Sequence, residues 1–89
     1  MRRIVQHKRF RKDIKRMTRR GKNEQKLYEA VDMLVRLGYL PTKLRPHRLV
    51  ARWGGFWECH IEPDWLLIYD VSDVEVLLVR TGTHADLFE

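Results

Sequence analysis

The first half of the chain carries apolar residues at the spacing of two amphipathic helices. The first apolar stripe consists of Phe10, Ile14 and Met17, and the second of Leu27, Ala30, Val31 and Leu34, widened by Met33 and Leu37. Residues three or four apart lie on one face of a helix, so each stripe predicts a helix with one buried face. Gly21 favours a turn between the helices, Asn23 is a suitable N-cap for the second, and Gly38 suits its end. We therefore expect two antiparallel helices joined by a short loop.

The second half of the chain changes to the pattern of β-strands. Pro41 and Pro46 prevent a regular helix, and only a short strand is predicted near them, at 49–53. Three β-rich runs follow, at 56–61, 65–71 and 74–81, and a weaker run at 3–6 precedes the helices. The turn sequences Glu62-Pro63-Asp64 and Ser72-Asp73 are short enough to force antiparallel neighbours. The run 65–71 is the most apolar, and we expect it to be the central strand, covered on both faces.

These elements predict an α+β domain with the order β-α-α-β-β-β-β, formed by residues 1–89 as one unit. We expect a twisted antiparallel sheet with the two antiparallel helices packed on one of its faces. The final segment, HADLFE, is too short to predict an element of its own. A chain of 89 residues buries one core of modest size, so two domains are excluded.

Composition adds a strongly polarised charge to this picture. The net charge is +6 at pH 7, and residues 1–26 hold twelve Lys or Arg but only Asp13 and Glu24 as acids. A one-sided basic surface attracts the phosphates of a nucleic acid or an acidic protein. A solvated helix face is the simpler use of such a charge run, and we favour nucleic acid over it.

Several classes of protein are excluded by what the sequence lacks. The single cysteine, Cys59, excludes an intramolecular disulfide and a multi-cysteine zinc site. No apolar run approaches the roughly 20 residues of a membrane span. The N-terminus MRRIVQHKRF lacks the apolar core of a signal peptide. We therefore expect a cytoplasmic protein with no membrane partner.

Three of the four histidines stand near other polar residues at predicted strand ends. His47 lies in the loop bordered by prolines, His60 ends one strand, and His84 follows the last strand. Asp64 lies across the predicted hairpin from His60, and successive hairpin ends and the chain terminus can meet at one sheet edge. These four side chains are candidates for one site, although each alone has a structural explanation. His7 is most simply a solvated residue at a helix start.

The chemistry that best suits these residues on a basic protein is metal-free cleavage of RNA. The ribose 2′-OH is an internal nucleophile, so the reaction needs a general base for its proton and a general acid for the departing 5′-oxygen. Histidine serves both roles near neutral pH. Arg80 is a candidate to stabilise the charge of the transition state. Trp65 and Phe88 are candidates to stack on a splayed base, although Trp65 suits the core equally well.

Other catalytic arrangements fit the sequence less well. Three histidines and an aspartate suggest zinc, but no two of the histidines have the helical i, i+3 or i+4 spacing common in zinc sites. Ser72 lies in the wrong hairpin for a Ser/His/Asp hydrolase, and no Gly-x-Ser-x-Gly motif is present. Cys59 and His60 are adjacent on a strand, so their side chains point to opposite faces. We therefore predict a site without a metal ion or another cofactor.

Three stretches of the sequence resemble one protein family. The stretches RPHRL, WGGFWECHIEPDWLLIY and RTGTHADLF, in this order, resemble the YafQ-type branch of the RelE/ParE toxin superfamily. The resemblance implies the toxin of a type II toxin–antitoxin system with a RelE/ParE-like fold. It also implies a ribosome-dependent endoribonuclease that cuts messenger RNA in the ribosomal A site and is held inactive by a cognate antitoxin.

The resemblance implies roles for individual residues as well. The acid–base residues of such toxins are matched by His47, His60, Asp64 and His84, the aromatic lining by Trp65 and Phe88, and the basic residue at the end of the last strand by Arg80. Relatives often have an acidic residue just before the loop histidine, where this chain has Pro46, so His47 is expected to lack a neighbouring carboxylate. We expect Asp64 and His84 to transfer protons and His60 to bind phosphate.

Two other functions remain compatible with the sequence. A ParE-like toxin without enzymatic activity would bind a protein target such as DNA gyrase, and a basic RNA-binding module would bind without cutting. The His/Asp set favours the nuclease, because a pure protein binder has no need of three histidines near one sheet edge. The expected partners are therefore an antitoxin, messenger RNA and the ribosome, whose RNA the basic N-terminal region would contact.

Overall fold

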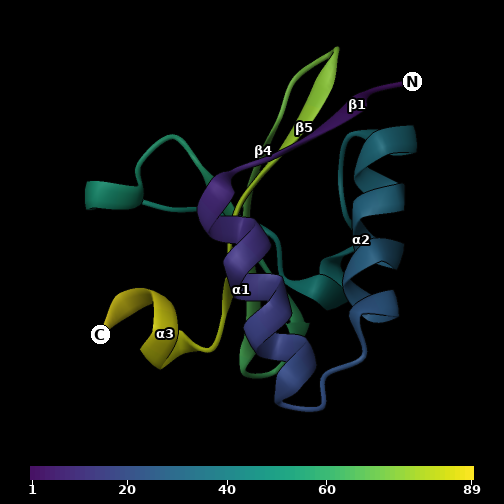
Figure 1. The fold of residues 1–89 in the computed structure, drawn as a ribbon. Helices are drawn as coiled ribbons and strands as arrows, with labels where there is room; N and C mark the ends of the chain where they lie inside the picture. Colours follow the sequence, from purple (N-terminus) through teal and green to yellow (C-terminus); the bar gives the residue numbers. More distant parts are fainter.

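The computed structural model describes residues 1–89 and shows an α+β fold around one sheet (Figure 1). Its elements are β1 (Arg3–Gln6), α1 (Lys8–Arg19), α2 (Glu24–Leu37), β2 (His47–Arg48), β3 (Trp57–Glu62), β4 (Trp65–Val71), β5 (Glu75–Gly82) and α3 (His84–Phe88), with 3₁₀ turns η1 (Thr42–Leu44) and η2 (Ala51–Trp53). The predicted class and the predicted order of strands and long helices are confirmed. No helix is both long enough and apolar enough to span a membrane.

The five strands form one sheet in the order β1-β5-β4-β3-β2. The prediction that β4 is the central strand is confirmed, and its first five residues are buried. The prediction of an entirely antiparallel sheet is wrong, because β1 pairs in parallel with β5, with Arg3 opposite Glu75. Short turns force antiparallel pairing only between the strands they join. Nearly the whole chain separates β1 from β5, so no turn fixes their relative direction.

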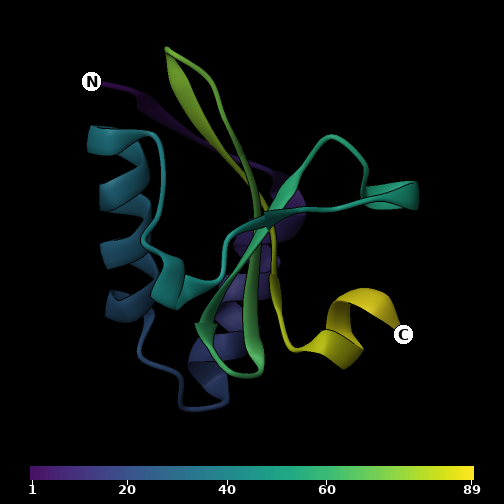
Figure 2. The same cartoon turned by 180° about the vertical axis from the view of Figure 1, so that it is seen from behind.

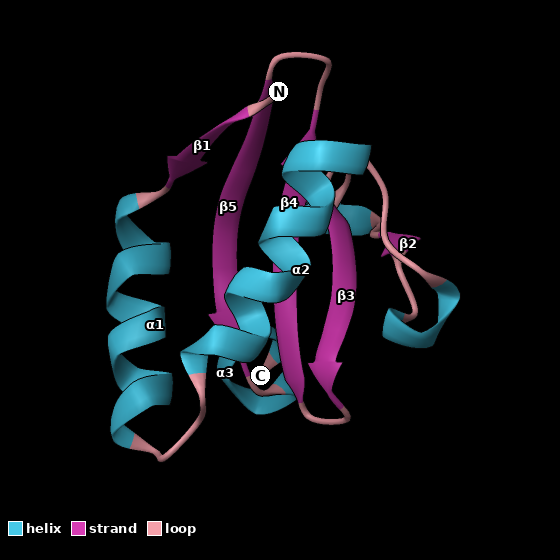
Figure 3. Ribbon diagram, turned by 90° about the vertical axis from the view of Figure 1, so that its right-hand side faces the viewer, coloured by secondary structure: helices cyan, strands magenta, loops and turns pink.

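Both long helices cover the same face of the sheet, as predicted (Figure 3). Their apolar stripes pack with the sheet in the main core, whose helical members are Phe10, Ile14, Met17, Leu27, Ala30, Val31 and Leu34. The side chain of Asn23 accepts the Gln25 N–H at 3.0 Å, which caps the start of α2. Gly38 ends the helix at φ +83°, a left-handed conformation that glycine adopts without a steric penalty. The helix boundaries follow from these local signals.

The opposite face carries a smaller apolar cluster and helix α3 (Figure 2). The cluster consists of Leu66, Ile68, Val79 and Leu87. The expectation that the C-terminal segment forms no element is wrong, because Thr83 and Asp86 build a capping box. The Asp86 N–H donates to the Thr83 hydroxyl at 3.1 Å, and the Thr83 N–H donates to the Asp86 carboxylate at 2.9 Å. Burial of Leu87 then holds this short helix on the sheet.

The segment before β3 also differs from the prediction. The strand expected at 49–53 is replaced by a two-residue pairing of His47–Arg48 with β3 and by the η2 turn. Ala51 adopts a positive φ of 59°, which turns the chain away from the ladder. Leu49 and Trp53 pack against the smaller cluster while Val50 is exposed. The apolar residues here therefore reflect packing on the sheet face, not membership of a strand.

Candidate active site

Strand β3 divides its side chains between the two faces of the sheet. Cys59 belongs to the main core under the helices, whereas Glu58 and His60 lie on the opposite face, beside Ile68 and Leu66 of β4. Burial raises the pKa of the Cys59 thiol to about 12, so the thiol stays protonated near neutral pH. Cys59 therefore packs the core, and Glu58 and His60 face the side of α3.

A buried carboxylate lies between two of the predicted histidines. The pairing of β2 with β3 puts His47 opposite Glu58. Glu58 Oε1 lies 3.3 Å from His47 Nε2 and 3.8 Å from His60 Nε2. The two imidazole ring centroids are 6.5 Å apart. The expectation that His47 lacks a carboxylate is therefore wrong, because the neighbouring strand supplies one that the adjacent residues in sequence do not.

The second nitrogen of each of these rings faces a backbone carbonyl. His47 Nδ1 is 3.0 Å from the Arg45 oxygen, and His60 Nδ1 is 3.3 Å from the Pro63 oxygen. A carbonyl only accepts hydrogen bonds, so each Nδ1 must be the donor, which leaves each Nε2 facing Glu58. The 3.3 Å separation between His47 Nε2 and Glu58 Oε1 is within hydrogen-bond distance, whereas the 3.8 Å separation between His60 Nε2 and the same oxygen is beyond it.

The hairpin between β3 and β4 connects this group with the C-terminal helix. Asp64 Oδ1 accepts the backbone N–H of His84 at 2.9 Å, and the adjacent Pro63 carbonyl contacts His60. The structure therefore brings His60, Asp64 and His84 to one end of one sheet face, as their order along the chain suggested. The His84 side chain is exposed at the first position of α3.

A row of aromatic side chains continues from His84. The ring centroids of His84 and Phe88 are 5.0 Å apart, and Phe88 meets Trp53 edge-on at 6.4 Å. Phe88 is partly exposed, which keeps it available as a lining residue. Trp53 was not among the predicted site residues, because its place beside the Gly54–Gly55 turn was interpreted as the end of a strand.

Trp65 lies in the core rather than in the site. Its side chain has no exposed surface and belongs to the main core on the helix-covered face. Its indole N–H donates to the Thr81 hydroxyl at 2.9 Å, and that hydroxyl donates to the Leu66 carbonyl at 2.6 Å. The prediction that Trp65 stacks on a base is therefore wrong, because the first residue of β4 points to the opposite face from His60.

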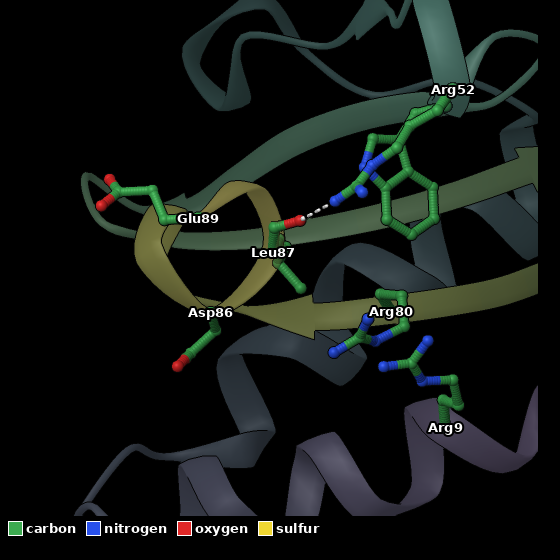
Figure 4. A pocket seen from close by; sticks show the side chains of 7 residues that line it. Arg9, Arg52, Arg80, Asp86, Leu87 and Glu89 are labelled. Carbon is green, nitrogen blue, oxygen red and sulfur yellow. Dashed lines mark hydrogen bonds between the residues drawn. The ribbon is translucent and has the colours of Figure 1, made fainter.

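Arg80 is placed apart from the histidines, in a buried ion pair. Its Nε and Nη2 donate to the two carboxylate oxygens of Asp13 at 2.6 and 3.2 Å, and Asp13 also accepts the Thr81 N–H at 3.2 Å. Arg80 lines an open pocket between η2, α3 and α1 that contains no histidine (Figure 4). The ion pair neutralises much of its charge and fixes α1 beside β5.

Helix α3 is held in place by Arg16 of α1 and by Arg20, the C-cap of that helix. Arg20 donates to both Asp86 oxygens at 2.6 and 3.2 Å, and Arg16 lies 3.7 Å from the same carboxylate. The hydrogen bond from Arg20, and after it those from Thr83, hold the pKa of Asp86 well below its ordinary value. A Cβ added to Gly82 would come within 2.9 Å of Asp86, so glycine permits this close approach. The position of His84 thus depends on contacts between remote elements.

Comparison with known proteins identifies the family. The family described as "Bacterial toxin of type II toxin-antitoxin system, YafQ" matches residues 2–89. The chain belongs to the YafQ toxin family. The mRNA interferase toxin YafQ of Escherichia coli strain K12 is 39% identical over 80 residues, which cover 89% of this chain and 87% of that protein. The resemblance to YafQ-type toxins is therefore confirmed.

Solved structures support the same assignment. The crystal structure of the E. coli DinJ-YafQ complex matches with a TM-score of 0.90 and 38% identity over the full length of both chains. A metal-bound toxin from Helicobacter pylori matches with a TM-score of 0.89 and 36% identity, over 99% of this chain and 100% of that one. In this chain, no group of three or more His, Cys, Asp or Glu side chains is arranged to hold a metal ion.

Proposed function

We propose that this toxin is an endoribonuclease that cuts messenger RNA in the ribosomal A site, with the 2′-OH of the substrate as nucleophile. The observation that carries the proposal is the placement of His47, His60, Asp64 and His84 at one end of one sheet face. A reaction with an internal nucleophile needs a proton acceptor, a proton donor and a cation near the phosphate. This group of side chains offers all three without a metal ion.

The roles are divided between the two halves of the site. Asp64 and His84 form the proton-transfer pair, since one Asp64 oxygen holds the His84 backbone and the exposed imidazole is free to reach the 2′-OH. His60 and His47, whose ring centroids are 6.5 Å apart beside Glu58, bind the scissile phosphate. Glu58 orients the two rings. Phe88, packed on His84, supports the base next to the cleavage site.

The same proposal includes the partners. E. coli YafQ has been solved in a complex with DinJ, and a comparable antitoxin would inhibit this chain. The ribosome would present the messenger RNA, and the exposed Lys and Arg residues of α1 would contact ribosomal RNA.

Induced expression in bacteria tests the activity directly. Primer extension on a translated messenger RNA should show cuts aligned with codons, and these cuts should disappear in His84→Ala. Asp64→Asn should lower the single-turnover rate by at least about 100-fold, because an amide still accepts the His84 N–H but is no base. Circular dichroism checks that both variants remain folded.

Two outcomes would contradict this assignment. Full toxicity of His84→Ala and Asp64→Asn would remove the acid–base mechanism, and DNA damage without RNA cuts would favour a gyrase inhibitor. Cleavage by purified toxin on programmed ribosomes should also survive EDTA once the ribosomal Mg²⁺ has been restored. Activity that is lost with EDTA and regained only with zinc would replace the metal-free mechanism.

A further inference from the structure

A basic pocket lies beside the candidate active site and has no role in the chemistry above. It has a volume of about 420 Å³ and is lined by Arg9, Arg52, Trp53, Arg80, Asp86, Leu87 and Glu89 (Figure 4). A second hollow continues from it along α1 and is lined by Arg9, Lys12, Asp13, Arg16 and Arg80. Arg9 and Arg80 line both, so the two hollows form one groove.

The positive charge of this groove is only partly balanced. Arg80 is paired with Asp13, but Arg9 forms no ion pair, and Arg52 donates only to the Leu87 carbonyl at 3.4 Å. The carboxylate of Asp86 is already bonded to Arg20. Figure 4 shows the Asp86 and Glu89 carboxylates turned away from the three guanidinium groups. Two exposed guanidinium groups are therefore left without a carboxylate partner in the pocket.

Trp53 is the aromatic residue of the pocket wall. The indole N–H of Trp53 is buried and makes no hydrogen bond. The open space of the pocket is lined by the guanidinium donors of Arg9 and Arg52. An anion with several acceptor oxygens would bond both guanidinium groups together. A phosphate group has this chemistry.

We propose that the pocket of Arg9, Arg52 and Trp53 binds a backbone phosphate of the RNA next to the scissile one. Trp53 packs on Phe88 and Phe88 packs on His84, so one RNA strand can follow this row from the pocket to the acid–base residues. An RNA is favoured over an acidic peptide because the pocket joins the site where RNA reacts. The inference rests on the proposed function and assigns a second phosphate contact to it.

The test removes the two unpaired cations together. Arg9→Ala/Arg52→Ala is compared with Arg36→Ala/Lys43→Ala, which removes the same charge from exposed residues outside the groove and the N-terminal basic region. The probe is a fluorescent single-stranded RNA with 2′-O-methyl riboses, which cannot be cut. Anisotropy at two salt concentrations gives Kd and its salt dependence for the wild type and both pairs.

The pocket pair should weaken RNA binding by at least about 10-fold, whereas the control pair should change it far less. The slope of log Kd against log salt should fall by about 0.7 for the phosphate contact that is lost. Equal weakening by both pairs would overturn the inference, because general charge would then explain binding. An unchanged Kd in the pocket pair, or a loss confined to antitoxin binding, would overturn it as well.

A neutral phosphate locates the contact. Methylphosphonate is placed at one linkage at a time in a messenger RNA on programmed ribosomes, and single-turnover cleavage is measured. For the wild type, methylphosphonate at one linkage beside the cleavage site should raise the half-saturating toxin concentration. For Arg9→Ala/Arg52→Ala, the same substitution should leave that concentration unchanged, because the contact is already lost. Additive effects at every linkage would overturn the assignment. RNA binding by the pocket without any cleavage would contradict the proposed function alone, and cleavage with unchanged binding in the pocket pair would contradict the pocket alone.

Discussion

Single side chains of the candidate site owe their properties to neighbours on other strands. Glu58 has no unusual position in the sequence, yet the register of β2 against β3 puts it between two histidines. Only about 6% of Glu58 is exposed, so solvent screens its charge weakly there. Trp65 is the opposite example. The sequence made it a candidate to stack on a base, but strand alternation buries it in the core.

Glu58→Gln should lower kcat by about 10- to 100-fold with little change in KM, because the neutral amide no longer holds the rings of His47 and His60 by its charge. The control is Glu75→Gln, which removes a carboxylate on β5, away from the site, that is paired with Arg3 of β1. Single-turnover cleavage on programmed ribosomes measures both variants. A Glu58→Gln rate equal to that of the control would mean that His47 and His60 act independently of this carboxylate.

Trp65→Phe should lower the free energy of unfolding by about 1–3 kcal/mol, because the Thr81 hydroxyl loses its donor and a small cavity opens. The cleavage rate of the folded variant should stay near that of the wild type.

Phe88→Leu should show the opposite pattern, with more loss of activity than of stability. Urea denaturation and cleavage assays on both variants measure these effects. A Trp65→Phe variant that is stable but inactive would restore the stacking interpretation.

At the scale of elements, α3 is the part that completes the candidate site. It carries His84 and Phe88, and it stays in place through its capping box, the Asp64 contact and the ion pair with Arg20. A five-residue helix has no stability of its own in water, so tertiary contacts must hold it. Loss of any of these contacts should therefore displace α3 and its site residues, although the strands beneath it are buried.

Two N-cap substitutions of similar cost can distinguish a loss of stability from a loss of activity. Thr83→Ala breaks the capping box of α3, and Asn23→Ala removes the N-cap of α2, each at a cost of about 1 kcal/mol. Only Thr83→Ala should lower cleavage, because α2 carries no site residue. Thermal melting and single-turnover rates test the pair. Equal activity in both variants would show that the site tolerates a loosened α3.

On the scale of the whole molecule, charge pairs connect elements that lie far apart in the sequence. Arg80 with Asp13 joins β5 to α1, and Arg20 with Asp86 joins the C-cap of α1 to α3. Lys22 and Lys26 both bond Glu62 at the end of β3, and these bonds lower the pKa of Glu62. The remaining basic side chains of α1 stay free for an anionic partner. Part of the basic excess thus stabilises the fold, and part remains available for binding.

These depressed carboxyl pKa values predict acid sensitivity. The pKa of Glu62 and of Asp86 lies below the ordinary 4.5 and 3.8, so their contribution to stability is complete above those values and is lost as the pH falls below them. Tm should therefore decline on acidification below about pH 4.5. Asp86→Asn should flatten part of this decline, which thermal melting between pH 7 and pH 2.5 measures. An identical pH profile in Asp86→Asn would show that its ion pair adds no stability.

Local signals in the sequence were enough to predict several elements of the fold. Apolar spacing, Asn23 and Gly38 set the long helices, and the short turns set the β3-β4-β5 meander with a central β4. These signals act between residues close in the chain, so they can be read without the fold. The order of His60, Asp64 and His84 along hairpin ends also sufficed to place them together.

The other features could not be predicted from the sequence, because they depend on contacts between residues far apart in the chain. The parallel pairing of β1, the formation of α3 and the partner of His47 each require a neighbour that no local pattern specifies. Strand alternation and cross-strand packing moved Trp65 into the core and brought Trp53 to Phe88. The basic pocket likewise exists only where α1, η2 and α3 meet. The sequence shows which residue types are present, but the distances between the side chains of the site are set by tertiary packing.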